Sequence, residues 1–145
     1  LFGNRNKSPI NNFHFAKNEI LYVTNNPEFS RVIIAGFDGA CSTGILPIHA
    51  KVNVKYLWYY MLSDYFLKQL LAVNPSLKRV DKGQLKRMEI VIPDETEQEE
   101  IVRLLDSVFE KEKKIYERIQ VTDEIEKIKK VILGKAFHGE LGIES

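Results

Sequence analysis

The sequence predicts an α+β fold, in which a small mixed sheet-and-helix domain is followed by a long C-terminal helix that forms a coiled coil. Three short β-rich runs occur in the first third of the chain, and an amphipathic helical pattern follows them. A second pattern begins after Pro93 and keeps apolar residues at three- and four-residue spacing for roughly 37 residues. We therefore expect a domain over residues 1–93 and a long helix with a tail over residues 94–145.

The composition excludes several classes of protein. The 145 residues are 44% hydrophobic and 28% charged, which does not fit intrinsic disorder, and the lone Cys41 cannot form an intramolecular disulfide. No apolar run approaches the roughly 18–20 residues that span a bilayer, and the first residues lack the apolar stretch of a signal peptide. We expect a soluble cytoplasmic protein with no membrane partner.

The first half predicts three strands and little other regular structure. Residues 1–18 are rich in Asn, Lys, Ser and Gly and are expected to form an arm or irregular loop. Residues 19–24, 31–37 and 44–50 are β-rich, and residues 39–44 between the last two are expected to turn. Pro47 confines the third strand to a sheet edge or a bulge, because proline cannot donate to the ladder.

A helix follows these strands. Asn53 can cap it, and Pro75 disfavours helical geometry at the preceding residue, so the helix should end near Val73. The segment NPSLKR (residues 74–79) is expected to turn, and Asp81 should lead a helical turn through Leu85. Residues 88–92 (MEIVI) predict a brief strand that Pro93 stops.

The long helix should begin at Thr96, because Thr96 and Glu99 have the spacing of a capping box. Its apolar stripe would be about 55 Å long, which one small domain cannot cover. The simplest partner is the same helix of a second copy, and an absent partner protein is the alternative. The expected interface residues are Ile101, Leu105, Val108, Ile115, Ile119, Ile125 and Ile132.

The chain offers little catalytic chemistry. His14, His49 and His138 have no spacing that places two on one helix face, so neither a metal site nor a Ser/His/Asp triad is supported. No phosphate-binding or dinucleotide-binding glycine motif is present. The acidic cluster at residues 95–100 is explained by favourable charge at a helix N-terminus. We expect a protein that is not an enzyme and has no cofactor.

The basic residues are distributed unevenly. Residues 1–92 hold 12 Lys+Arg against 6 Asp+Glu, whereas residues 93–145 hold 9 against 14. Such asymmetry suggests that the first half meets an anion. Residues 76–87 combine basic density with a Pro turn and polar donors, and DNA contact and a solvated surface are weighed evenly there. The candidate DNA-binding residues are Arg31, Lys51, Ser76, Lys78, Arg79, Lys82 and Arg87.

The last half of the sequence resembles the end of a specificity (S) subunit of a type I restriction-modification system. The matching pieces are NPSLKRVDKGQLKRMEIVIP, then TEQEEIVRLLD with its Glu-Gln-x-x-Ile-Val motif, then a long helix and LGKAFHGELG. The upstream AGFDGACSTGILPI and the Trp/Tyr-rich helix look like part of a target recognition domain. Against that family, residues 1–93 correspond to a partial recognition domain, so the chain could be part of a longer subunit.

The resemblance implies a non-catalytic module that confers DNA sequence specificity. Such a module reads one half of a bipartite double-stranded DNA target, and methyltransferase (M) subunits, and through them the restriction subunit, dock around its helix. Because two such helices run antiparallel in the family, we expect an antiparallel homodimer. The alternative is a truncated oligomerisation or decoy fragment that pairs through its helix without binding DNA.

Overall fold

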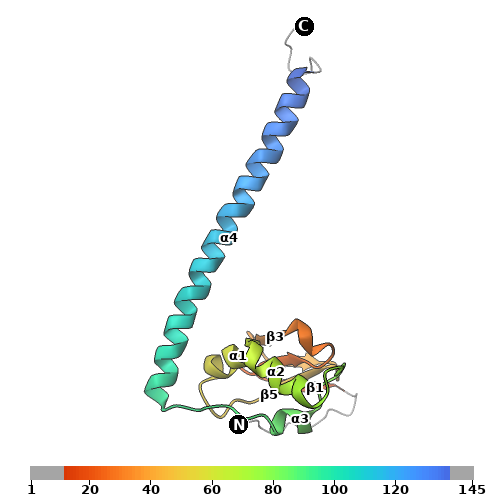
Figure 1. The fold of residues 1–145 in the computed structure, drawn as a ribbon, viewed down its shortest axis with the longest axis vertical. Helices are drawn as coiled ribbons and strands as arrows, with labels where there is room; N and C mark the ends of the chain where they lie inside the picture. Colours follow the sequence, from red (N-terminus) through yellow and green to blue (C-terminus); the bar gives the residue numbers. More distant parts are fainter. Residues whose placement is uncertain (1–11, 138–145) are drawn as a thin grey trace. The chain divides into compact units, whose positions relative to one another are not determined.

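The computed structural model describes residues 12–137. It contains small antiparallel sheets, short helices and one long helix, so the α+β prediction is confirmed (Figure 1). The chain divides into a compact unit that ends at Val102 and a second unit that begins at Arg103. Residues 1–11 of the arm predicted over residues 1–18 lie outside the described residues, as do His138 and the last part of the LGKAFHGELG segment.

A three-stranded antiparallel sheet with the order β3-β2-β5 is the centre of the first unit. Its strands are β2 (Ile20–Val23), β3 (Val32–Ile34) and β5 (Ile45–Ile48), which confirms the three strands expected from the sequence. Pro47 lies in β5 at the sheet edge, as predicted, opposite Leu21. Alternate side chains of β2 face different cores, with Ile20 and Tyr22 on one face and Leu21 on the other.

Helices α1 (Val54–Leu62) and α2 (Asp64–Val73) supply the larger core on the Ile20 face. The predicted cap at Asn53 is confirmed, since its side-chain oxygen accepts from the Tyr56 amide at 3.1 Å. The prediction of one helix is wrong because Ser63 is extended and interrupts it. Its hydroxyl donates to the Tyr60 carbonyl and accepts from the Phe66 amide, so one side chain ends α1 and begins α2.

A second, two-stranded sheet was not expected from the sequence. Strands β1 (Phe13–Phe15) and β4 (Gly39–Cys41) pair antiparallel, which corrects the predicted loop around residue 14 and the predicted turn at residue 39. Phe15 packs with Leu21 and Ala35 in the smaller core. A Cβ at Gly39 would lie 2.8 Å from the Phe15 ring, so glycine there makes room for the aromatic side chain.

The turn led by Asp81 is confirmed as the short helix α3 (Lys82–Lys86), with a capping box between Asp81 and Gln84. The strand predicted at residues 88–92 is wrong, because side chains of α1 and α2 bind this segment instead of a neighbouring strand. Tyr60 and Gln69 donate to the Glu89 carbonyl, and Tyr56 donates to the Val91 carbonyl at 2.6 Å.

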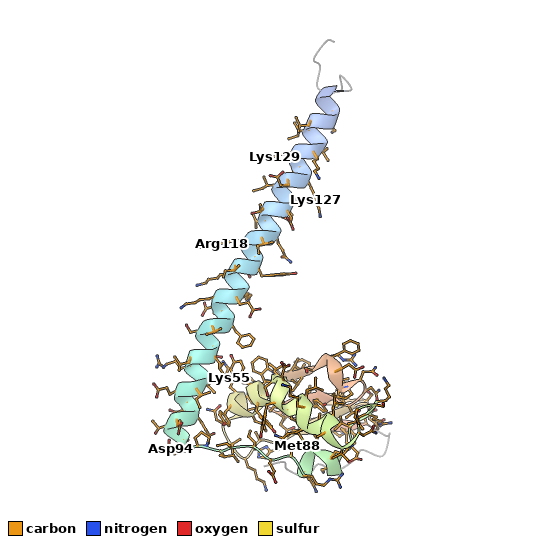
Figure 2. The ribbon with its side chains drawn as sticks, in the orientation of Figure 1. Lys55, Met88, Asp94, Arg118, Lys127 and Lys129 are labelled. Atoms are coloured by element: carbon orange, nitrogen blue, oxygen red, sulfur yellow. The ribbon has the colours of Figure 1, made fainter. Side chains whose placement is uncertain are left out.

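The long helix α4 (Glu95–Phe137) confirms the predicted C-terminal helix but begins one residue before Thr96. The Asp94 carboxylate accepts from the Glu97 amide at 2.9 Å, so Asp94 takes the capping role that the sequence assigned to Thr96 (Figure 2). Gln98 is 6% exposed, and its side chain donates to the Pro93 carbonyl and accepts from the Asn53 amide. The first two turns of α4 are therefore part of the first unit.

Candidate nucleic-acid interface

Two of the predicted basic residues lie beside the C-terminal end of β2. The segment at residues 78–80 pairs with residues 24–26 in an antiparallel manner. The Asn26 amide donates to the Lys78 carbonyl at 2.8 Å, and the Val80 amide donates to the Thr24 carbonyl at 2.9 Å. Backbone hydrogen bonds therefore fix the chain at Lys78 and Arg79, while both side chains remain exposed.

Arg31 reaches the same end of the sheet from β3. Because β3 runs antiparallel to β2, the residue that precedes β3 lies opposite Val23, whose amide donates to the Arg31 carbonyl. The Arg31 guanidinium donates to the Asn25 carbonyl at 2.9 Å. Arg31, Lys78 and Arg79 thus surround residues 24–26, although 47 residues separate Arg31 from Lys78 in the sequence. We call this surface the basic end of the sheet.

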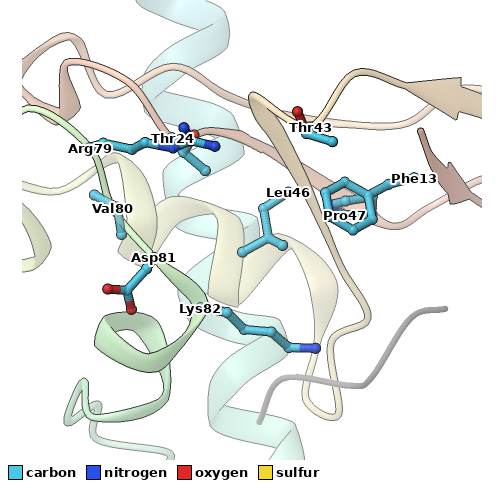
Figure 3. A pocket seen from close by; sticks show the side chains of 9 residues that line it. All are labelled: Phe13, Thr24, Thr43, Leu46, Pro47, Arg79, Val80, Asp81 and Lys82. Carbon is cyan, nitrogen blue, oxygen red and sulfur yellow. The ribbon is translucent and has the colours of Figure 1, made fainter. Parts of the chain in front are cut away.

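A pocket of about 240 Å³ lies next to this surface, beside β5 (Figure 3). Its cationic side chains are Arg79 and Lys82, its hydroxyls are those of Thr24 and Thr43, and its apolar wall includes Pro47. The remaining lining residues are Phe13, Leu46, Val80 and Asp81. Such a lining can accept an anionic or hydrogen-bonding group and contact a flat apolar surface at the same time.

The Asp81 carboxylate is engaged elsewhere in this pocket. One of its oxygens accepts from the Gln84 amide at 2.8 Å, which is the N-cap interaction of α3. Its role is thereby explained by helix capping. Lys82, the first residue of α3, follows directly and adds positive charge to the pocket wall.

The other three predicted basic-surface residues are more dispersed. Ser76 lies in the exposed turn before Lys78, and its amide donates to the Asn74 side chain at 3.0 Å. Arg87 follows the last residue of α3, at the opposite end of that helix from Lys82. Lys51 follows β5 at the end that pairs with Ile20, away from the basic end of the sheet. The structure therefore brings four of the seven candidates together and leaves Lys51 apart.

Sequence reasoning missed the residues that position this surface. The sequence assigned residues 24–26 only to a strand end and a connection. In the structure their backbone groups form hydrogen bonds with Val80, Arg31 and Lys78 respectively. Thr43 was assigned to a turn and lines the pocket. The only available signal was the run of polar residues after the second strand, because the partner segment lies more than 50 residues away.

The apolar stripe of α4 is largely exposed. Val108, Ile115, Ile119, Ile125 and Ile132 have exposed fractions of 47–59%, whereas Ile101 and Leu105 are half-buried. Further large apolar side chains are exposed along the helix, namely Leu104, Phe109, Tyr116, Val121, Ile128, Val131 and Leu133. Ion pairs such as Lys114–Glu110, at 3.6 Å, also lie on the helix surface. A surface of this apolar content is typical of a helix that contacts another protein segment.

The described residues offer neither a membrane-spanning helix nor a cluster of metal ligands. No helix among them is long and apolar enough to cross a membrane. In the same part of the chain, no three side chains from His, Cys, Asp and Glu are grouped so that they could hold a metal ion.

The fold and its exposed surfaces define a small α+β domain that continues into a long helix with a surface suited to macromolecular contact. A family model for the type I restriction modification DNA specificity domain matches residues 4–127. The chain therefore belongs to this family.

Two further comparisons agree with the family. The chain is 29% identical over 130 residues to the type I restriction enzyme EcoDI specificity subunit of Escherichia coli, a match that covers 88% of this chain and 29% of that protein. It is also similar to a chain from a study of complex assembly and conformational transition of the type I R-M system. That match has a TM-score of 0.64 at 21% identity and covers 84% of this chain and 31% of the other. The second likeness shows the fold, and the chain spans about three-tenths of each relative.

Proposed function

We propose that this chain is a non-catalytic module that gives a type I restriction-modification enzyme its DNA sequence specificity. In this proposal the basic end of the sheet binds one part of a bipartite double-stranded target. The observation that carries it is the gathering of Arg31, Lys78 and Arg79 around residues 24–26, next to a pocket that Lys82 also lines. Cationic side chains beside a pocket with hydroxyls and an apolar wall suit phosphate and base-edge contacts.

Ser76, Arg87 and Lys51 are assigned supporting roles. Ser76 lies in the turn before Lys78, so its hydroxyl can donate to a phosphate that Lys78 neutralises. Arg87 lies one short helix further on and is assigned to the DNA backbone. Lys51 lies at the opposite end of β5, and its contact would require the duplex to extend along that strand.

A salt series on the whole chain tests DNA binding. Each phosphate contact contributes about 0.9 to the slope of log K against log salt concentration, so a Lys78→Ala, Arg79→Ala variant should lose up to about two units of slope. The probe is a fluorescent duplex of random sequence, titrated between about 50 and 200 mM salt. A matched control removes one Arg and one Lys from α4 through Arg118→Ala, Lys127→Ala and should keep the slope (Figure 2). Equal slopes for both double variants would contradict the assignment.

The exposed stripe of α4 supports the other part of the proposal. We infer that two copies pair antiparallel through this stripe and that M subunits dock around the paired helices. Burial of each large aliphatic side chain contributes roughly 1.5–3 kcal/mol, so the stripe residues would stabilise a dimer. A two-fold axis needs the same surface on both copies, and a continuous stripe provides it.

Oligomeric state tests this pairing. A Val108→Asp, Ile115→Asp variant should dissociate the dimer in light scattering after size exclusion, because unpaired buried carboxylates are costly. The control, Ser107→Asp, Gln120→Asp, adds the same two charges at exposed neutral positions, each about 100° round the helix from a neighbouring stripe residue, and should remain dimeric. A monomeric, folded wild type would exclude the homodimer, and a dimer insensitive to the first variant would place the interface elsewhere.

The exposed stripe also favours a second candidate function. A chain that pairs through α4 without binding DNA would act as a decoy for DNA-binding subunits. This alternative requires the stripe but not the basic end of the sheet. Wild-type chain that dimerises and shows no duplex binding at low salt would support the decoy and exclude the specificity module.

A further inference from the structure

The loop between β2 and β3 has an unusual backbone. It forms a single 3-10 turn, Pro27–Phe29, and the residues on either side, Asn26 and Ser30, have φ angles of 52° and 46°. Among the described residues three non-glycine positions have positive φ, and two of them flank this turn. Left-handed geometry is costly for a residue such as serine, and strain of this kind concentrates at binding sites.

Hydrogen bonds hold the loop in this form. The Phe29 amide donates to the Asn26 carbonyl at 3.1 Å, and the Ser30 amide donates to the Pro27 carbonyl at 3.0 Å. The Asn26 amide donates in turn to the Lys78 carbonyl, which ties the loop to the basic end of the sheet. Pro27 is buried beneath the turn. The loop is therefore held at Asn26 by the segment that contains Lys78, and at Pro27 by burial of the proline side chain.

The anchored loop presents Phe29 to solvent. The side chain is 66% exposed, and the Arg31 guanidinium carbon lies 5.4 Å from the ring centroid. Arg31 is itself positioned by its hydrogen bond to the Asn25 carbonyl. An aromatic ring with a cation beside it, fixed by a strained backbone, is preorganised for contact with another molecule.

We propose that Phe29 contacts the bases of duplex DNA as an apolar wedge, while Arg31, Lys78 and Arg79 neutralise the adjacent phosphates. This inference rests on the proposed DNA-binding function and names the residue that reaches the bases. Apolar side chains inserted at a base step unstack it and bend the duplex, which allows a protein to contact more of it.

Charge complementarity selects DNA as the occupant of this surface. The Arg31 guanidinium lies beside the Phe29 ring, and Lys78 and Arg79 lie on the segment that pairs with residues 24–26 at the start of the loop. Glu28 is the one carboxylate within residues 24–31. Phe37 offers the contrasting case at the other end of β3. It is 69% exposed, but its ring packs 5.9 Å from the Phe15 ring centroid, and the neighbouring Asp38 carboxylate accepts from the Lys17 amide. Phe37 is therefore an exposed aromatic residue that lies outside the basic end of the sheet.

The test compares Phe29→Ala and Phe37→Ala in the full chain, with a fluorescent duplex of random sequence as the probe. Phe29→Ala should weaken binding about 5- to 150-fold, the fold-change that corresponds to one aromatic–base contact of about 1–3 kcal/mol. Its salt slope should remain that of the wild type, because an apolar contact releases no counterions. Phe37→Ala should bind as the wild type does. Phe29→Leu should retain part of the affinity, since a leucine can still insert between bases.

Each outcome has a defined meaning. If the wild type binds with a steep salt slope and Phe29→Ala binds equally well, this inference is wrong and the proposed function stands. If Phe29→Ala keeps DNA binding but loses capture by an M subunit, the loop contacts protein and the inference is also wrong. If the wild type binds no duplex at low salt, both proposals fail. Because Phe29 is exposed, unchanged thermal unfolding of Phe29→Ala will show that the fold is intact.

Discussion

Gln98→Ala should detach the start of α4 from the domain and destabilise the first unit. The side chain bridges two backbone groups, with its amide nitrogen 2.8 Å from the Pro93 carbonyl oxygen and its amide oxygen 3.1 Å from the Asn53 nitrogen. Truncation removes both hydrogen bonds and leaves the two part-buried groups without their partner. At about 1–1.5 kcal/mol for each bond, the expected loss is roughly 2–3 kcal/mol.

Thermal unfolding measures this loss. For a unit of this size 1 kcal/mol corresponds to about 4–8 °C, so Gln98→Ala should lower Tm by roughly 8–24 °C. Gln98→Met retains the side-chain length without the two hydrogen bonds. It should therefore show most of the fall in Tm that Gln98→Ala shows. Gln120→Ala, an exposed position on the same helix, is the matched control and should change the free energy of unfolding by less than about 0.5 kcal/mol. If Gln98→Ala melts within about 2 °C of Gln120→Ala, the bridge does not stabilise the unit.

Two further variants test the cores. Burial raises the pKa of Tyr22 from 10.0 to about 12, so the wild type should lose stability as pH rises through this interval, because unfolding releases the proton. Tyr22→Phe should reduce that loss in pH-dependent unfolding, while burial that also raises the pKa of Cys41, Tyr56 and Tyr60 leaves a smaller one. The variant should be at least as stable near neutral pH, since the buried hydroxyl has no hydrogen-bond partner among the described residues, and an unchanged alkaline loss would refute this. Gly39→Ala should cost about 1–3 kcal/mol in urea unfolding, because the new Cβ would meet the Phe15 ring at 2.8 Å. Gly36→Ala, with open space around it, is the control, and equal midpoints would contradict the clash.

The elements predicted correctly were those with a strong local signal. The β-branched runs that contain Ile20, Val32 and Ile45 became strands, and Asn53 and Asp81 capped helices as their types favour. The exposed apolar stripe of α4 was visible from spacing alone. These features depend on neighbours within one or two turns, which a single sequence contains.

The errors arose where distant residues decide the structure. Residues 88–92 alternate like a strand, but Tyr60 and Gln69 provide hydrogen bonds that no local pattern reveals. The three-residue strands β1 and β4 stabilise each other across 23 intervening residues and carry almost no signal of their own. The apolar spacing around Ser63 continues as it would in a helix interior. Its hydroxyl nevertheless accepts from the Phe66 amide, so Ser63 caps a new helix and the first helix ends there.

The candidate site was predictable only in part for the same reason. Basic density marked Lys78 and Arg79, but the link to Arg31 depends on how β3 pairs with β2. Lys51 carries the same charge and lies at the other end of the sheet, so charge alone cannot separate the two groups. Phe29 had no signal at all, because exposure and backbone geometry define its position.

The structure also separates the Glu-Gln-x-x-Ile-Val motif, one of the segments that carry the family resemblance, from the residues that would bind DNA. In the Glu-Gln-x-x-Ile-Val motif, Gln98 bridges two backbone groups of the domain and Val102 is buried, so the motif attaches α4 to the fold. Substitution of Gln98 should therefore act through stability, with a lower Tm and an unchanged salt slope in the fraction that remains folded. Lys78 and Arg79 are exposed and hold no core together, so their substitution should change the salt slope and leave Tm unchanged. A Gln98 variant that altered the slope without lowering Tm would place DNA contact at the helix start and contradict this division.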